Sequence, residues 1–200
     1  MRLFRPGLIA GWLYPDSIFR IKTNESLLCL TFDDGPDPDS TPKLLEILAM
    51  HNVKALFFCK GSAAEKFPDL IKRINSEGHI TGNHGYNHLK GWLTSTEKYM
   101  ADVERAASLI PSSFFRPPYG SLKLSQYRRL SKKYRIIFWD IMSYDFDKSF
   151  GAKNSLKILT GKLRPGSIIV LHDKPGSSVL DFLDEFIETS FGKGYRFVLP

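Results

Sequence analysis

The sequence predicts an α/β fold, a distorted and incomplete (β/α) barrel with about seven parallel strands. Short β-rich apolar runs alternate with segments of helical periodicity along the chain, as in an open doubly wound sheet or a barrel. No linker or low-complexity block interrupts this alternation. The 200 residues are few for a full eight-unit barrel, which normally takes about 250. We therefore expect one domain over residues 26–200, preceded by a segment over residues 1–25 that packs on it.

The expected strands are apolar runs of the composition that suits buried strands, of which "SLLCLTF" is the first. In order, they cover residues 26–32, 54–60, 79–83, 113–119, 135–142, 167–173 and 195–200.

Helices are expected between these strands, at about residues 42–51, 63–77, 95–110, 122–133, 153–163 and 178–190. The first is predicted to have Thr41 as its N-cap and Pro42 as its first helical residue, because proline has no N–H to leave unpaired there. Gly78 is expected to end the second helix.

A formal charge of +7 favours polyanionic neighbours, such as cell-wall polymers, an anionic membrane surface or nucleic acid. The densest basic run, residues 126–135, is interpreted as the solvated face of a surface helix. No recognised nucleic-acid motif accompanies the charge, so no nucleic-acid partner is expected. Cys29 and Cys59 lie inside apolar runs and are interpreted as buried small hydrophobes.

The opening segment has a short apolar patch that Pro6, Gly7 and Pro15 interrupt, and no small-residue cleavage site follows it. We therefore expect no secretory signal, and no apolar stretch is long enough to span a bilayer. The expected location is cytoplasmic or peripheral to the membrane, with the membrane face or the anionic cell wall as a contact. The sequence leaves the oligomeric state open.

Conspicuous polar residues follow the predicted strands, at the ends where α/β folds gather their chemistry. Each group has an ordinary alternative: "DDGPDPDS" can be a turn that caps a helix, and "RPPYG" can be a rigid turn. His51 and His79, beside helix ends, are interpreted as structural. All of these residues are expected at the same edge of the sheet, where the strands end, and this favours a functional site. The site would be made of Asp33, Asp34, His84, His88, Arg116, Tyr119, Asp140, Asp145, His172 and Asp173.

His84 and His88, four residues apart, can be ordinary loop histidines, because such a pair alone is a weak signal for a metal site. If they meet one carboxylate, the three residues can bind a metal ion. Two imidazoles and one aspartate form a three-ligand set that leaves an open position on zinc for water, whose pKa falls toward about 7. A second carboxylate beside that position is a natural general base. Adjacent aspartates can divide these two tasks only where the strand breaks into a turn, which Gly35 and Pro36 permit.

Five short motifs occur in order between residues 31 and 173: "TFDDG", "HGYNH", "RPPYG", "WDIMSYDF" and "IIVLHD". Together they resemble the motifs of polysaccharide deacetylases with a NodB homology domain, carbohydrate esterase family four. The resemblance covers most of the chain and implies a distorted (β/α) barrel. It also implies that Asp34, His84 and His88 hold a divalent metal, usually zinc, though cobalt, nickel or manganese serve in some members.

The resemblance further implies roles in cleaving an acetamide. Asp33 would be the general base, with Arg116 orienting it and keeping it ionised. The backbone N–H of Tyr119 would stabilise the oxyanion, and His172 would protonate the departing amine. Val170, two residues before His172, and Phe146 would line the acetyl pocket.

Three residues depart from the family's pattern. Gly85 stands where the family usually has Ser or Thr, which removes a hydroxyl that would brace the loop. Met142 replaces the aspartate that often partners the catalytic histidine, and Phe146 replaces a tryptophan. Two residues can take over as the partner of His172: Asp145 by its place in the motif, or Asp140 because it lies two residues before Met142 on the strand.

These residues favour an enzyme that removes acetyl groups from the N-acetylated sugars of peptidoglycan or a chitin-like glycan. One alternative is a metal-dependent hydrolase of small cyclic amides or ureides, since the same domain resembles such enzymes. The other is a glycan-binding protein that has lost its activity. Both aspartates, both metal histidines and the acid histidine are retained, which argues for catalysis.

Overall fold

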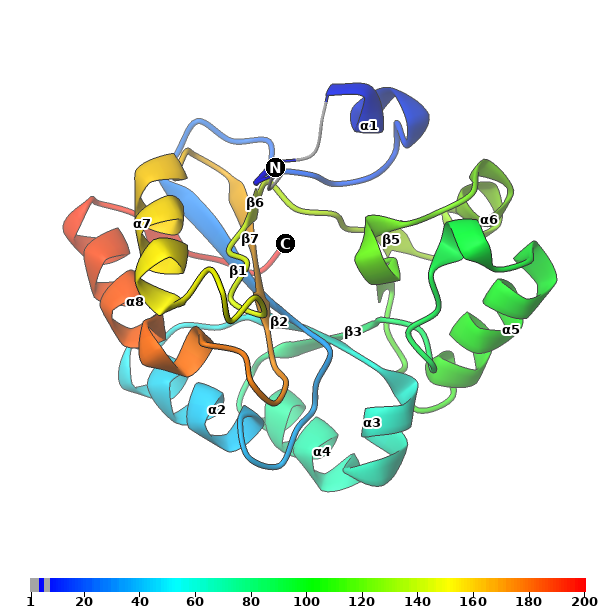
Figure 1. Ribbon diagram of the computed structural model, residues 1–200, viewed down its shortest axis with the longest axis horizontal. Coiled ribbons are helices and arrows are strands. Elements are labelled where there is room, and N and C mark those ends of the chain that lie inside the picture. The colour runs from blue at the N-terminus through cyan, green and yellow to red at the C-terminus, as the bar shows by residue number, and fades with distance from the viewer. Residues whose placement is uncertain (1–3, 6–7) are drawn as a thin grey trace.

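A computed structural model describes residues 4–5 and 8–200 of the chain. Its centre is a curled sheet in which every strand pair is parallel (Figure 1). The order is β5-β4-β3-β2-β1-β7-β6, and β8 pairs with β1. The strands are β1 (Leu27–Asp33), β2 (Leu56–Cys59), β3 (Ile80–Asn83), β4 (Phe114–Phe115), β5 (Arg135–Ile136), β6 (Ile141–Met142), β7 (Ser167–His172) and β8 (Arg196–Phe197). The distorted, incomplete barrel that the sequence predicts is thereby confirmed.

Helices cover the outside of the sheet (Figure 1). The larger apolar core lies between the strands and α2, α4, α7 and α8, and a second core joins α5 and α6 to β4 and β5. The α-helices are α1 (Leu8–Leu13), α2 (Thr41–Met50), α3 (Gly61–Lys66), α4 (Pro68–Ser76), α5 (Thr96–Ala107), α6 (Leu124–Leu130), α7 (Ala152–Lys162) and α8 (Leu183–Gly192). Three 3-10 turns are η1 (Gly91–Leu93), η2 (Pro118–Gly120) and η3 (Val179–Asp181).

The barrel is incomplete because β5 and β6, the two edges of the sheet, do not pair with each other. Residues 137–140 cross between them: the Ile137 N–H donates to the carbonyl of Phe115, and the Asp140 N–H donates to that of Ile168. The segment before β1 pairs with this region: Ile18 forms a parallel bridge with Ile137, and Arg20 forms an antiparallel bridge with Ser167. The segment over residues 18–21 therefore spans the gap in the barrel.

Several predicted boundaries were wrong. The helix over residues 63–77 is broken at Phe67 because Pro68 disfavours a helical conformation in the residue before it. The first helix begins at Thr41, so Ser40 and not Thr41 is the N-cap. The strand over residues 135–142 is two short strands, since its middle makes the crossing between the sheet edges.

Tyr14 connects the segment before β1 to the rest of the molecule. Its side chain is 5% exposed, and its hydroxyl donates to the carbonyl of Leu122 at 2.6 Å. Its ring stacks on Phe138 and meets Tyr127 edge-on. Trp12, on α1, is by contrast 88% exposed. Among the described residues, none of the helices has the length and apolarity needed to cross a membrane, and peripheral membrane contact stays a prediction.

We expect Tyr14→Phe to lower the free energy of unfolding by about 1 kcal/mol, because a buried hydrogen bond is lost and the Leu122 carbonyl keeps fewer donors. Urea denaturation monitored by tryptophan fluorescence measures the difference. Trp12→Ala is the control, expected to change stability by less than about 0.5 kcal/mol because the side chain is exposed. Equal effects of the two substitutions would contradict the structural role of Tyr14.

Candidate active site

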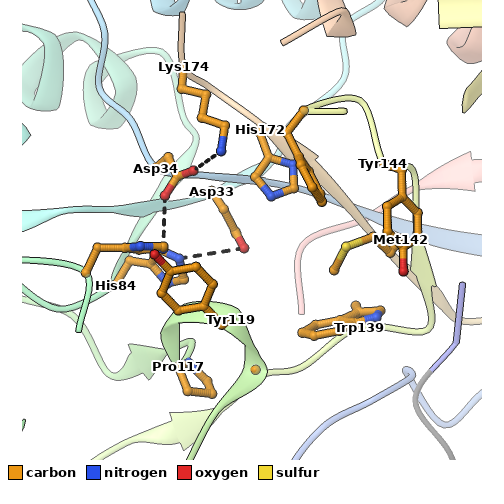
Figure 2. Close-up of a pocket in the computed structure, with 13 residues that line it drawn as sticks. Asp33, Asp34, His84, Pro117, Tyr119, Trp139, Met142, Tyr144, His172 and Lys174 are labelled. Carbon is orange, nitrogen blue, oxygen red and sulfur yellow. Dashed lines mark hydrogen bonds and ion pairs between the residues drawn. The ribbon is translucent and has the colours of Figure 1, made fainter. Parts of the chain in front are cut away.

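A pocket of about 400 Å³ opens at the carboxyl ends of the central strands. Figure 2 shows Asp33, Asp34, His84 and Lys174 on one side of the pocket and Trp139, Met142 and Tyr144 on the other. The polar residues that line the pocket are Asp33, Asp34, His84, His88, His172 and Lys174. Its apolar and aromatic lining consists of Pro117, Tyr119, Trp139, Met142, Tyr144 and Phe146. Of the residues that the sequence places at one edge of the sheet, the structure brings Asp33, Asp34, His84, His88, Tyr119 and His172 into the pocket, whereas Arg116, Asp140, Asp145 and Asp173 do not line it.

Asp33 and Asp34 both reach this pocket because β1 ends between them. Asp34 has a φ of 80°, in the left-handed region, so the alternation of the strand stops there. The next residue, Gly35, has to be glycine because a Cβ at this position would lie 2.2 Å from Oδ2 of Asp173. The Asp173 carboxylate accepts hydrogen bonds from the hydroxyls of Ser40 and Thr41, which connects the end of β7 to the start of α2.

Asp34, His84 and His88 could hold a metal ion. Each offers one ligand atom, and the three atoms lie within 4.8 Å of one another. Nε2 of His88 is 3.1 Å from Oδ1 of Asp34. Nδ1 of His84 lies 2.7 Å from the carbonyl of Arg116 and must donate to it, so Nε2 of His84 has a free lone pair. This donor set fits a divalent cation such as zinc.

The charges in the site also favour cation binding. Burial would raise the pKa of Asp34, but His84, His172, His88 and Lys174 outweigh it and bring this pKa below its usual range. Nζ of Lys174 is 2.9 Å from Oδ2 of Asp34. Burial lowers the pKa of His84, and burial together with His84 lowers the pKa of His88 to about 4. These directions favour an ionised Asp34 and neutral His84 and His88, the forms in which all three can bind a cation.

Asp33 is held by Arg116. Nη1 of Arg116 donates to Oδ1 of Asp33 at 2.7 Å, and the guanidinium lies over the ring of Phe58. The arginine side chain is completely buried, so this ion pair is screened little by solvent. Oδ2 of Asp33 is 3.9 Å from Nε2 of His84. Asp33 therefore presents its second oxygen beside the candidate metal ligands, where a general base is needed.

His172 faces the pocket from β7 and is paired with Asp145. Nδ1 of His172 lies 2.8 Å from Oδ1 of Asp145, whose Oδ2 accepts the backbone N–H of His172 at 2.8 Å. Burial lowers the pKa of His172, but the charge and hydrogen bond of Asp145 outweigh it and the pKa is raised. Asp140, the other candidate partner, instead accepts hydrogen bonds from Arg164 and Ser167.

The remaining predicted residues are placed as follows. Tyr119 is 64% exposed with a φ of 58°, and its ring centroid is 4.5 Å from that of His88. The Phe146 ring lies 4.6 Å from that of His172, edge-on. Val170 is completely buried and does not line the pocket, so its contact with an acetyl group stays a prediction.

The two histidines interpreted as structural lie away from the pocket. Nε2 of His51 pairs with Asp184 at 2.6 Å. Nδ1 of His79 accepts the backbone N–H of Ala55, and burial lowers the pKa of His79 to about 4. Both cysteines are buried and free, as expected.

Some pocket residues could not be recognised from the sequence pattern. Lys174 follows the last motif, and its position two residues after His172 was the available signal. Trp139 and Tyr144 lie inside "WDIMSYDF", but a motif does not say which of its aromatic side chains faces a cavity. Trp139 does so because Gly120 leaves room for it: a Cβ there would lie 2.5 Å from the indole.

A carboxylate beside three possible metal ligands, with a histidine in the same pocket, is an arrangement that suits a metal-compatible hydrolase. A family model described as polysaccharide deacetylase matches residues 20–136. That match covers more than half of the chain, so the chain belongs to the polysaccharide deacetylase family. Membership confirms the class of enzyme that the five motifs predict.

Known proteins similar to this chain are consistent with that membership. A peptidoglycan-N-acetylglucosamine deacetylase of Bacillus cereus is 38% identical over 186 residues, which cover 88% of this chain and 67% of the relative. The crystal structure of the Bc1960 peptidoglycan N-acetylglucosamine deacetylase has a TM-score of 0.85 and 35% identity, covering 94% of this chain and 92% of that one. BA3943 of Bacillus anthracis, a pseudoenzyme of carbohydrate esterase family four, has a TM-score of 0.81 and 25% identity, covering 90% of this chain and 66% of that one.

We expect Asp145→Asn to lower the pKa of His172, because burial is then opposed only by the more distant charges of Asp33 and Asp34. The raised pKa means that protonation of His172 stabilises the fold below about pH 6.5, and that this contribution is lost as pH rises through the pKa of the folded state. An NMR titration of the His172 ring measures the shift. Asp140→Asn should leave it unchanged, and an equal shift in both variants would refute the pairing.

Proposed function

We propose that this protein removes the acetyl group from N-acetylglucosamine units of peptidoglycan and uses a divalent metal ion for this reaction. Zinc is the metal that we propose first, ahead of cobalt, nickel or manganese. The observation that carries the proposal is that Asp33 and His172 line the same pocket as the Asp34, His84 and His88 cluster. The similar peptidoglycan deacetylases support the choice of glycan.

In this proposal Asp34, His84 and His88 hold the metal ion, which supplies a Lewis acid and lowers the pKa of water. Asp33, kept ionised by Arg116, accepts the proton of the attacking water. His172 gives a proton to the amide nitrogen as the C–N bond breaks, so the sugar leaves as a neutral amine and acetate is the second product.

The remaining groups of the pocket act on the substrate without exchanging protons. The backbone N–H of Tyr119 would stabilise the negative charge that develops on the carbonyl oxygen. Met142 and Phe146 form part of an apolar wall that excludes water and accommodates the acetyl methyl group. Asp145 holds the His172 ring through Nδ1, which leaves Nε2 to face the substrate.

Two other functions remain as outcomes of the test. A small cyclic amide would fit a pocket of about 400 Å³ as well as one sugar unit does. The similarity to BA3943, a pseudoenzyme, makes a protein that only binds glycans the other alternative. The retained pairs of Asp33 with Arg116 and of Asp145 with His172 favour catalysis.

We expect zinc- or cobalt-loaded protein to release acetate from peptidoglycan fragments, measured beside N-acetylglucosamine oligomers and a panel of cyclic amides. Asp33→Asn should lower kcat by about 100-fold to 10,000-fold, because the general base is lost. A chelator should abolish release, and adding the metal back should restore it. Turnover of the cyclic amides alone would replace the proposed substrate, and glycan binding without acetate release would identify a binding protein.

Asp145→Asn should lower kcat for acetate release more than Asp140→Asn does. Asp145 orients and charges the proposed acid, whereas Asp140 bonds Arg164 and Ser167 away from it. Steady-state kinetics across pH 5 to 9 compares the two, with thermal melting to confirm that both variants are folded. The reverse ranking would show that the contact of Asp145 with His172 is not used in turnover.

A further inference from the structure

The loop between the two candidate metal histidines has an unusual backbone. Gly85 has a φ of 72° and His88 has a φ of 57°, both in the left-handed region. Such a conformation turns successive N–H groups toward one side of the loop, where they can surround an anion. Gly85 has no side chain, so the loop lacks the hydroxyl that the family's pattern leads one to expect at this position.

A carboxylate from α5 fills that side of the loop. Asp102 accepts the backbone N–H of Tyr86 at 2.8 Å and that of Asn87 at 3.0 Å, and the side-chain amide of Asn87 donates to it at 2.7 Å. The aspartate is 7% exposed, so these hydrogen bonds replace most of its solvation. Charge-assisted hydrogen bonds of this kind are roughly twice as strong as neutral ones.

The opposite side of the loop is held by α3. The carbonyl of Gly85 accepts the N–H of Gly61 at 2.8 Å, and the carbonyl of Tyr86 accepts the N–H of Ser62 at 3.2 Å. These donors are at the start of the helix, where N–H groups have no partner within the helix. The loop is therefore fixed between the first turn of α3 and the carboxylate on α5.

The Tyr86 side chain adds a second connection between the same two helices. Its hydroxyl donates to Glu65 of α3 and accepts a hydrogen bond from Arg105 of α5. The guanidinium of Arg105 also lies 3.5 Å from the centre of the Tyr86 ring. The side chains of Arg105 and Glu65 are 57% and 53% exposed, whereas Asp102 is 7% exposed and bonds the loop backbone directly. We therefore expect the loop conformation to depend more on Asp102 than on the contacts of the Tyr86 side chain.

We propose that Asp102 is a positioning residue for the metal site, which fixes the loop so that His88 reaches Asp34 and His84. The inference rests on the proposed function, since it assigns a role in binding the metal ion of that function. His84 is held separately, through Nδ1 and the Arg116 carbonyl. Loss of Asp102 should therefore affect His88 far more than His84.

Gly85 and Asp102 also depend on each other. A Cβ on Gly85 would lie 3.0 Å from Oδ2 of Asp102, and the φ of 72° disfavours any other residue. Restoring the family's hydroxyl by Gly85→Ser would therefore strain the loop and push the carboxylate away. In the proposed arrangement the carboxylate of Asp102 braces this loop, in which Gly85 supplies no hydroxyl.

The test measures metal affinity, by competition of zinc with a chromophoric chelator, for the chain of residues 1–200 and its variants. Asp102→Asn keeps the shape of the side chain but places an amide NH2 group, a donor, against the backbone N–H groups of the loop, which are also donors. This variant should weaken zinc binding by about 10-fold to 100-fold, as the loss of an outer partner of a metal ligand typically does. Glu104→Gln is the control: Glu104 lies on the same helix and pairs with Lys133 at the surface. Its zinc affinity should stay within about twofold of the wild type.

Three further measurements distinguish positioning from general stability. Thermal melting should find Asp102→Asn folded at the assay temperature, and the absorption spectrum of bound Co²⁺ should change in this variant and not in Glu104→Gln. Gly85→Ser should weaken zinc binding as well. Unchanged zinc affinity in Asp102→Asn, or tighter binding in Gly85→Ser, would overturn the role of Asp102. A wild-type chain that binds no zinc or cobalt would overturn the metal dependence of the proposed function, and the role of Asp102 with it.

Discussion

The buried guanidinium of Arg116 is the interaction on which both the site and the barrel depend. It donates to Asp33, the proposed base, and to Thr31 on the same strand. It also donates to the carbonyl of Phe138, in the crossing between the two sheet edges, while its own carbonyl accepts from His84. Because the guanidinium is buried away from water, its positive charge and its N–H groups must be matched by acceptors within the protein. The planar fork of arginine can make these contacts at once, and a lysine could not.

The fold class and the polar side of the site could be predicted from the sequence because both depend on local patterns. Alternating apolar runs and helical segments indicate a parallel sheet, and such a sheet places the residues after its strands on one rim. Asp34, His84 and His88 follow β1 and β3, so their proximity required no knowledge of loop geometry. The five motifs, which occur in the same order as in polysaccharide deacetylases, then predicted the family.

The rest of the site depends on contacts between distant segments, which no local pattern reveals. Asp140 and Asp145 have similar neighbours in the sequence, yet only the loop after β6 carries Asp145 to His172. Gly85 alone suggests a loosened loop, whereas Asp102, on a helix farther along the chain, holds it. Val170 lies two residues before His172 on the same strand, so the alternation of side chains predicts that it faces the pocket, but it is completely buried between neighbouring strands.

The segment that spans the gap in the barrel has a consequence for how the chain folds. Ile18 and Arg20 meet Ile137 and Ser167, so the contacts that close the barrel join residues more than one hundred positions apart in the sequence. During synthesis this segment emerges early and has no partner until most of the domain has followed. Because closing so long a loop costs conformational entropy, we expect these contacts to form after the neighbouring strands have paired. Trp139 lies in the crossing that this segment bridges and also lines the pocket, so the shape of the active site depends on a segment outside the site.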